Sequence, residues 1–157
     1  MSEAVNIVVC GSDSYGQERQ YEGEAQFEAD KPRILRERAG LLRHLNGIYL
    51  ARGVTSVVTD GTHGSAELAE QWANSLGVKC ICVQSEPLKY GTKARLQRRK
   101  AIVQASLQVK DHGLPVLFVS APGGDRELES MAKAHGLEVE DVVLEDAAAP
   151  ADAGVTP

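Results

Sequence analysis

Five short apolar runs alternate with segments of helical periodicity, and this alternation is the strongest constraint on how the chain can fold. The runs cover residues 5–10, 54–59, 78–83, 116–121 and 137–143. Several of them are apolar on both faces, which is typical of strands in a parallel sheet that helices cover on both sides. The pattern therefore predicts a doubly wound, Rossmann-like α/β fold with a parallel sheet of about five strands.

The segments between these runs predict four helices, at 32–52, 65–76, 92–111 and about 125–135. Pro32 suits the first turn of the first helix, and Ser65 stands in the position of an N-cap for the second. The polar stretch over residues 12–31 is long for a loop, so we expect it to be functional, partly helical or mobile.

The composition is that of one globular domain, with 157 residues, of which 43% are hydrophobic and 25% charged. We expect that domain to cover residues 1–144. From residue 145 onward Ala, Pro, Asp and Gly dominate, which predicts a disordered tail over 145–157.

Several classes of partner and compartment fit the sequence poorly. A formal charge of −5 and an aromatic content of 4% argue against nucleic acid, and no apolar run reaches membrane-span length. No signal peptide is visible at the N-terminus, so we expect a cytoplasmic protein. The three cysteines, Cys10, Cys80 and Cys82, fall in predicted strands and are expected to be buried, reduced thiols. Their spacing gives no metal site, and we expect no cofactor.

Glycine-containing loops follow three of the predicted strands. In a doubly wound sheet, ligands bind beyond the carboxyl ends of the strands at the topological switch point. A residue without Cβ lets a ligand approach the backbone, and a helix N-terminus attracts anions. Turn glycines and an N-cap would also explain these loops without any ligand, and a lone loop histidine is usually solvated. The expected binding residues here are Gly11, Ser12, Gly61, Thr62, His63, Gly64, Ser65, Pro122, Gly123 and Gly124.

Arg98 interrupts the apolar face of the predicted helix at 92–111. Residues placed at 100° intervals put it among Ala94, Ile102, Ala105 and Val109. A buried arginine needs a partner, because an unpaired buried charge is costly. The partner could be an anionic ligand or an internal carboxylate of Asp60 or Glu67, and we favour the ligand.

Three motifs, in order, resemble those of the SLOG superfamily, whose Rossmann-like members bind nucleotides and nucleotide-derived ligands. The first runs from Asp60-Gly61-Thr62-His63-Gly64-Ser65 to Trp72-Ala73, the second is Tyr90-Gly91-Thr92-Lys93 with Arg98-Arg99, and the third is Ala121-Pro122-Gly123-Gly124. The resemblance covers about residues 5–143 and is greatest to the small single-domain members. It implies a homodimer or a higher homo-oligomer, since relatives often complete the pocket across an interface.

The superfamily includes the lonely-guy phosphoribohydrolases, which cleave the base from a nucleoside 5′-monophosphate. Arg99-Lys100-Ala101 is similar to their Arg-Lys-Ala segment, but their Pro-Gly-Gly-x-Gly-Thr-x-x-Glu motif is altered here. Arg126 stands at the third glycine, Glu127 at the threonine and Ser130 at the catalytic glutamate, while Glu129 is one position early. These departures make hydrolysis by the family route doubtful, although Arg126 could bind an anion itself.

Three hypotheses about function follow. In the first, the protein senses or sequesters a nucleotide-derived small molecule, ADP-ribose-like, a cyclic nucleotide or a nucleoside monophosphate, with Tyr15 or Tyr21 stacking on the base and segment 12–31 closing over it. In the second, it hydrolyses the N-glycosidic bond, with Arg99 stabilising ribose phosphate and Glu127 or Glu129 as the acid/base. In the third, it is an interaction module with a vestigial pocket. The altered third motif favours binding over catalysis.

Overall fold

A parallel five-stranded sheet forms the centre of the protein in the computed structural model, which describes residues 4–84 and 91–142. The strands are β1 (Val5–Val9), β2 (Val54–Thr59), β3 (Lys79–Cys82), β4 (Val116–Ser120) and β5 (Glu138–Asp141). Their order is β3-β2-β1-β4-β5, and every neighbouring pair is parallel. The predicted doubly wound α/β fold is confirmed.

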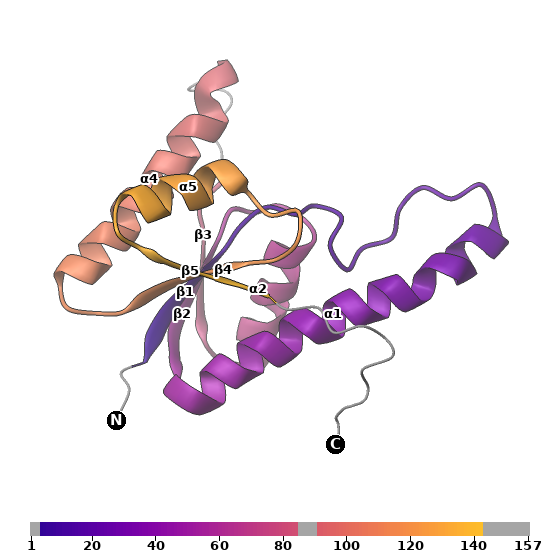
Figure 1. The fold of residues 1–157 in the computed structure, drawn as a ribbon, viewed down its shortest axis with the longest axis horizontal. Coiled ribbons are helices and arrows are strands. Elements are labelled where there is room, and N and C mark those ends of the chain that lie inside the picture. The colour runs from indigo at the N-terminus through magenta and orange to yellow at the C-terminus, as the bar shows by residue number, and fades with distance from the viewer. Residues whose placement is uncertain (1–3, 85–90, 143–157) are drawn as a thin grey trace.

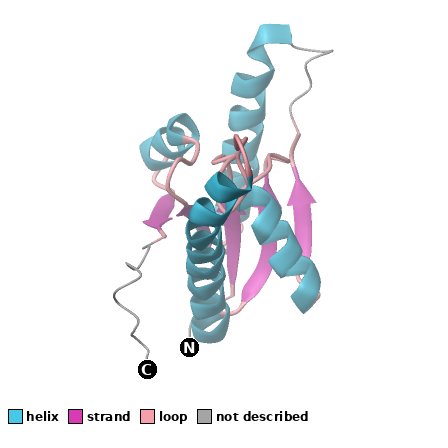
Figure 2. Ribbon diagram, turned by 90° about the vertical axis from the view of Figure 1, so that its right-hand side faces the viewer, coloured by secondary structure: helices cyan, strands magenta, loops and turns pink. Residues whose placement is uncertain are grey.

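Helices cover both faces of this sheet (Figures 1 and 2). α1 (Glu24–Arg52) and α2 (Ser65–Leu76) lie on one face. α4 (Ala94–Asp111), preceded by the 3₁₀ turn η1 (Gly91–Lys93), and α5 (Arg126–Ala134) lie on the other. The order of the strands reverses between β1 and β4, so the switch point of the fold lies at the carboxyl ends of these two strands.

The central strand β1 separates two apolar clusters by the alternation of its side chains. Val5, Ile7 and Val9 pack with α1 and α2, whereas Val8 and Cys10 pack with α4 and α5. The apolar run at residues 5–10, which only Asn6 interrupts, is therefore explained by burial on both faces.

The first helix is longer than the sequence predicts. α1 begins at Glu24 instead of residue 32, and Pro32 lies inside it. Proline inside a helix lacks the backbone donor and usually marks a first turn. Here the turns before Pro32 are held by tertiary contacts that the sequence pattern does not reveal.

An ion-pair network centred on Arg33 provides those contacts. Its guanidinium binds the Asp30 carboxylate at 2.7 Å, pairs with Glu37 and donates to the Gln17 carbonyl oxygen at 2.7 Å. The hydrogen bonds from Arg33 and from the Tyr21 hydroxyl hold the pKa of Asp30 well below its usual range. The stretch at 12–23 is thus fastened along the first half of α1, and the rest of the predicted segment 12–31 is helical.

The remaining boundaries agree with the predicted ones to within a few residues. Most of the expected connection at 87–91 and all of the expected tail at 145–157 lie outside the described residues. None of the described helices combines the length and apolarity needed to cross a membrane.

We predict that Leu41→Ala lowers the free energy of unfolding by about 2–5 kcal/mol, because Leu41 is fully buried between α1 and the sheet and its truncation leaves a cavity. Leu50 lies on the same helix but is 84% exposed, so Leu50→Ala should change stability by less than about 0.5 kcal/mol. Urea unfolding of both variants measures the difference, and equal losses would contradict this assignment of the core.

Candidate functional site

The loops that follow β1 and β4 meet at the switch point of the sheet. An isolated antiparallel bridge joins Gly11 to Gly124, and the Asp125 N–H donates to the Cys10 carbonyl oxygen at 3.4 Å. Gly11 has a φ of +81°, and a Cβ there would lie 2.4 Å from the Asp125 nitrogen. The glycine expected to contact a ligand is therefore also required for the two loops to approach each other.

The Asp60 carboxylate joins the loop after β2 to the same point. Asp60 is 2% exposed, and its Oδ2 accepts the Gly11 N–H at 2.9 Å. Its Oδ1 accepts the Thr62 N–H at 3.1 Å and the Thr62 hydroxyl at 2.6 Å. The Ser65 hydroxyl donates to the Gly11 carbonyl oxygen at 2.6 Å instead of capping α2, so the predicted N-cap is wrong.

The three loops and α4 enclose a polar cleft of about 340 Å³ at the carboxyl edge of the sheet. This volume lies within the range of small-molecule sites in proteins. Its described lining contains three arginines and three aspartates and no aromatic side chain. The lining residues are Gly11, Ser12, Asp13, Asp60, Thr62, Arg95, Arg98, Arg99, Gly123 and Asp125.

Arg98 reaches this cleft from the sheet side of α4. The buried positions of that helix include Ala94 and Ile102, one turn before and after Arg98, as predicted. Val103 and Ser106 complete the buried face, whereas Ala105 is exposed and Val109 only half-buried, so that part of the predicted face is wrong.

The Arg98 guanidinium is only partly satisfied although its side chain is 11% exposed. Nη1 donates to the Asp60 carbonyl oxygen at 3.3 Å, and Nη2 lies 3.9 Å from the Asp60 carboxylate. Nε is buried and has no hydrogen-bond partner among the described residues. Asp60, one of the two carboxylates predicted as an internal partner of Arg98, does lie beside the guanidinium. It leaves the Nε donor of Arg98 without an acceptor among the described residues.

Ser12 adds a strained backbone to the cleft. It is the one described non-glycine residue with a positive φ, at 61°, and its hydroxyl donates to the Pro122 carbonyl oxygen at 2.6 Å. Such conformations cost about 1–2 kcal/mol for an L-residue and cluster at functional sites. The hydrogen bond to Pro122 fixes this turn of the cleft wall.

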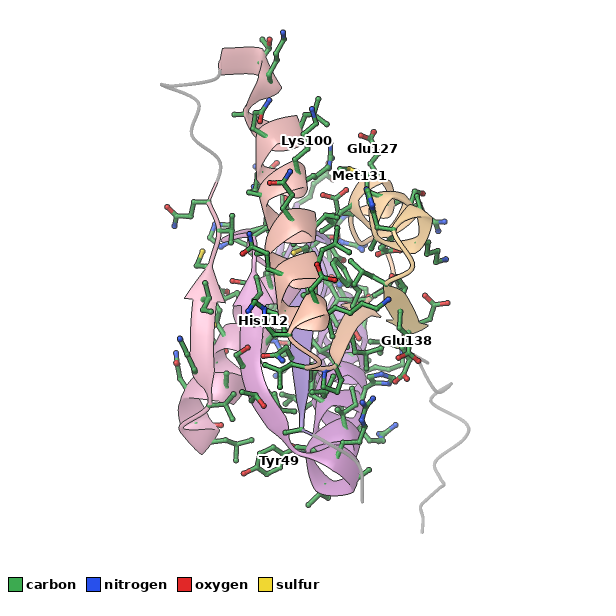
Figure 3. The ribbon with its side chains drawn as sticks, turned by 90° about the vertical axis from the view of Figure 1, so that its left-hand side faces the viewer. Tyr49, Lys100, His112, Glu127, Met131 and Glu138 are labelled. Carbon is green, nitrogen blue, oxygen red and sulfur yellow. The ribbon has the colours of Figure 1, made fainter. Side chains whose placement is uncertain are left out.

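Arg99 is held by carboxylates. Its Nε donates to both oxygens of Asp125 at 3.0 Å, and its Nη1 donates to Glu127 at 2.9 Å. Asp125 also accepts the Leu128 N–H at 3.1 Å as the N-cap of α5. Glu127 stands on the outer side of α5, where its side chain is 76% exposed, and it does not line the cleft (Figure 3).

Several predicted binding residues lie around a second cleft of about 370 Å³, on the far side of the Pro122-Gly123-Gly124 turn. Arg126 and Glu129 face this second cleft between α5 and the ends of β4 and β5. The Glu129 carboxylate accepts the Ser120 hydroxyl at 2.6 Å. Gly123 is the only residue of this turn that lines both clefts, whereas Pro122 and Gly124 line the second cleft alone. The structure therefore divides between two clefts the residues that the sequence analysis assigned to one pocket.

Other predicted site residues contact the protein itself. Tyr15 is 2% exposed and belongs to the core under α1 and α2, and burial raises the pKa of its hydroxyl. Tyr21 packs edge-on against Phe27 with ring centroids 5.5 Å apart. Neither tyrosine lines the cleft, so the structure places neither of them where a base in the cleft could stack on it.

Residues 61–64 of the first motif mainly contact other parts of the protein or the solvent. His63 has a side chain that is 82% exposed and lies 3.5 Å from Glu67, which fits a solvated histidine. Gly61 packs against Cys82 and Gln84 at the edge of the sheet. A Cβ on Gly64 would lie 1.9 Å from the Ser12 carbonyl oxygen, so this glycine is required for loop contact.

Sequence reasoning missed Asp13, Arg95 and Asp125 as lining residues and considered Asp60 only as an ion-pair partner. Two of them carried a recognisable signal. Asp60 stands directly between a strand and a glycine turn, and Asp125 stands at a helix start where a capping carboxylate is common. The described residues contain no group of three or more His, Cys, Asp or Glu side chains suited to a metal ion.

The cysteines differ from the expectation of three buried thiols. Cys10 is buried, Cys80 is half-buried and Cys82 is exposed. Burial, followed by the nearby charges of Asp60 and Asp125, raises the pKa of the Cys10 thiol well above its usual value. Burial also raises the pKa of Cys80.

Comparison with known proteins gives no match to a family model, to a curated protein or to a solved structure. The resemblance to the SLOG superfamily therefore stays a prediction from the motifs.

We predict that Gly64→Ala destabilises the protein by about 2–4 kcal/mol, because the new methyl group meets the Ser12 backbone at a φ of +77°. Gly77 has a similar φ of +71° but no atom within 4 Å of an added Cβ, so Gly77→Ala should cost only about 1 kcal/mol. Urea unfolding compares the two, and equal costs would show that the loops do not pack as described.

We predict one fast-reacting thiol at pH 8 in a titration with a disulfide reagent, and its loss in Cys82→Ser. The thiolate is the reactive form, and a raised pKa keeps Cys10 and Cys80 protonated until the pH rises further. All three thiols should react quickly in denaturant. An undiminished fast phase in Cys82→Ser would contradict the burial of the other two.

Proposed function

We propose that the protein binds an anionic, nucleotide-derived small molecule in the cleft at the switch point and does not cleave it. The observation that carries the proposal is the Arg98 guanidinium, which is nearly buried at the cleft wall and whose Nε finds no acceptor among the described residues. Buried polar groups are almost always hydrogen-bonded, and a bidentate anion such as a phosphate would satisfy an arginine.

The surroundings of Arg98 support an anion. Arg95 lines the same cleft, is exposed and forms no ion pair with a described residue, so it adds a positive charge there. The backbone at Gly11 and Gly123 lines the wall without side chains. Of the neighbouring carboxylates, Asp125 is paired with Arg99, whereas Asp60 accepts hydrogen bonds from Gly11 and Thr62 and lies 3.9 Å from Arg98 Nη2.

The residues that line the cleft favour contacts to the phosphate and ribose of a nucleotide over contacts to its base. No aromatic side chain of the described residues faces the cleft, so it has no stacking platform for a base apart from the arginine guanidinium planes. Recognition would therefore rest on phosphate and ribose, which favours an ADP-ribose-like ligand among the three kinds expected.

Hydrolysis of the N-glycosidic bond is the weaker alternative. Glu127 is paired with Arg99, and Glu129 faces the second cleft, so neither predicted acid/base group lines the first one. Among the described residues, Asp13 is the one carboxylate of the cleft without a hydrogen-bond partner, and hydrolysis would have to use it. Incubation with nucleoside monophosphates should release no free base.

The test is thermal unfolding in the presence of ADP-ribose, cyclic nucleotides and nucleoside monophosphates. A ligand at about a hundred times its Kd should raise Tm by about 5–10 °C. Arg98→Ala should weaken binding about ten- to hundredfold, since it removes a charge-assisted hydrogen bond to the anion.

Arg126→Ala is the matched control, because Arg126 is an exposed arginine at the second cleft and should leave the affinity unchanged. The absence of a shift with every ligand would refute the proposal. An equal loss of affinity in both variants would indicate that the ligand binds in the second cleft, which Arg126 lines, and not in the first.

A further inference from the structure

The second cleft carries charged side chains that the ligand site proposed above does not use. It lies between α5 and the carboxyl ends of β4 and β5, and its volume is about 370 Å³, against about 340 Å³ for the first cleft. Arg126, Glu129 and Lys133 line it from α5. Asp141 lines it from the last position of β5. Two charges of each sign therefore face one cleft, and none of them lines the first cleft.

These opposite charges do not pair with one another. Arg126 and Glu129 are three residues apart on α5, and Glu129 and Lys133 are four apart. At both spacings, side chains of opposite charge on a helix commonly form an ion pair. Within residues 4–84 and 91–142, none of the four charged side chains forms one. Both signs of charge are therefore available to a ligand.

The Glu129 carboxylate is turned toward the cleft wall instead of toward the cations on its own helix. Its Oε2 accepts the Ser120 hydroxyl at 2.6 Å, so the end of β4 fixes its direction. A Cβ on Gly124 would lie 3.0 Å from the same Oε2 and 3.0 Å from the Ala121 carbonyl oxygen, so a larger residue would displace the carboxylate or the turn. Oε1 accepts no hydrogen bond from a described residue and is left for a ligand.

Arg126 has no structural role that would explain its place. It is the first residue of α5, where the helix dipole disfavours a cation, and it is exposed. Positions 126, 129 and 133 lie within about 60° of one another around the helix. The side of α5 that faces the cleft therefore presents a cation, an anion and a second cation in succession.

We propose that the second cleft binds a small zwitterion, namely a free amino acid. Arg126 would hold the carboxylate through two parallel hydrogen bonds, and Glu129 would accept the ammonium group through Oε1. A ligand with charges of one sign fits less well. A dicarboxylate would face the carboxylates of Glu129 and Asp141, whereas a diamine would face Arg126 and Lys133. Only a ligand that carries both signs complements the whole lining.

This site is separate from the one proposed for a nucleotide-derived anion. The linings of the two clefts share only Gly123. Arg126→Ala should therefore remove amino-acid binding and keep any rise in Tm that ADP-ribose produces. The two proposals can then fail independently.

The first test is a titration of the full chain with each of the common amino acids, followed by NMR of its backbone amides. Concentrations up to about 10 mM detect a Kd of about 1 mM. At least one amino acid should shift the amide signals of Ser120 and Gly124. Its analogue without the amino group and its analogue without the carboxylate should each bind at least roughly tenfold more weakly, because each analogue loses one charge-assisted contact.

The second test compares charge variants by the same titration. Arg126→Ala and Glu129→Gln should each weaken binding about ten- to hundredfold. The glutamine keeps an oxygen that can accept the Ser120 hydroxyl, so the thermal unfolding curve should not change. Lys100→Ala and Glu138→Gln are the matched controls, because both residues are exposed and line neither cleft (Figure 3). The controls should bind like the wild type.

Three results would overturn the proposal. The first is the absence of any shift at Ser120 and Gly124 with every amino acid. The second is equal binding of an amino acid and of either single-charge analogue, which would show that the cleft recognises one sign of charge. The third is full affinity in both Arg126→Ala and Glu129→Gln, which would place the ligand elsewhere.

Discussion

The carboxylate of Asp60 is the contact on which the carboxyl edge of the sheet depends. It is almost fully buried at the end of β2, where a charge without partners would be strongly destabilising. Its hydrogen bonds go to Gly11 after β1 and to Thr62 in its own turn, and the Arg98 guanidinium approaches it from α4. One side chain thereby fixes the relative positions of two loops and a helix.

Once these elements are fixed, contacts within the protein hold the walls of the cleft in place. The Gly11–Gly124 bridge and the Ser12–Pro122 hydrogen bond connect the loop after β1 to the loop after β4. The positive φ of Ser12 is maintained by these contacts on both sides of the turn. For the proposed ligand, such a cleft would lose little conformational entropy on binding, which favours affinity.

The sequence predicts the fold well because the fold depends on local patterns. Apolar runs, glycines after strands and helical periodicity are visible in the chain, and they place β2 at its observed residues. The start of α1 could not be predicted, since Pro32 signals a first turn and the opposing contacts include those of Arg33 to the Ser14 and Gln17 carbonyl oxygens in the preceding loop. At Pro32, tertiary contacts override the low propensity of proline for the interior of a helix.

The candidate site was only partly predictable for a similar reason. The position of Arg98 follows from its spacing of four residues from Ala94 and Ile102, which any helix imposes. The direction in which a turn residue points depends on its partners, so Arg126 and Glu129 could not be assigned to the second cleft from the motif alone. Tyr15 was misassigned because an aromatic residue in a polar stretch can enter the core when the chain folds back over it.

The distribution of charge supports the proposal that the cleft binds its ligand without cleaving it. A general acid or base needs a carboxylate that is free to exchange a proton with the substrate. In this cleft Asp60 is bonded to backbone and hydroxyl donors, and Asp125 caps α5 while it holds Arg99. These two carboxylates hold the walls in place, whereas Arg98 and Arg95 retain unused donors. Asp13 is the cleft carboxylate that these contacts leave unengaged, so the proposal of binding without cleavage requires that it transfers no proton to the ligand.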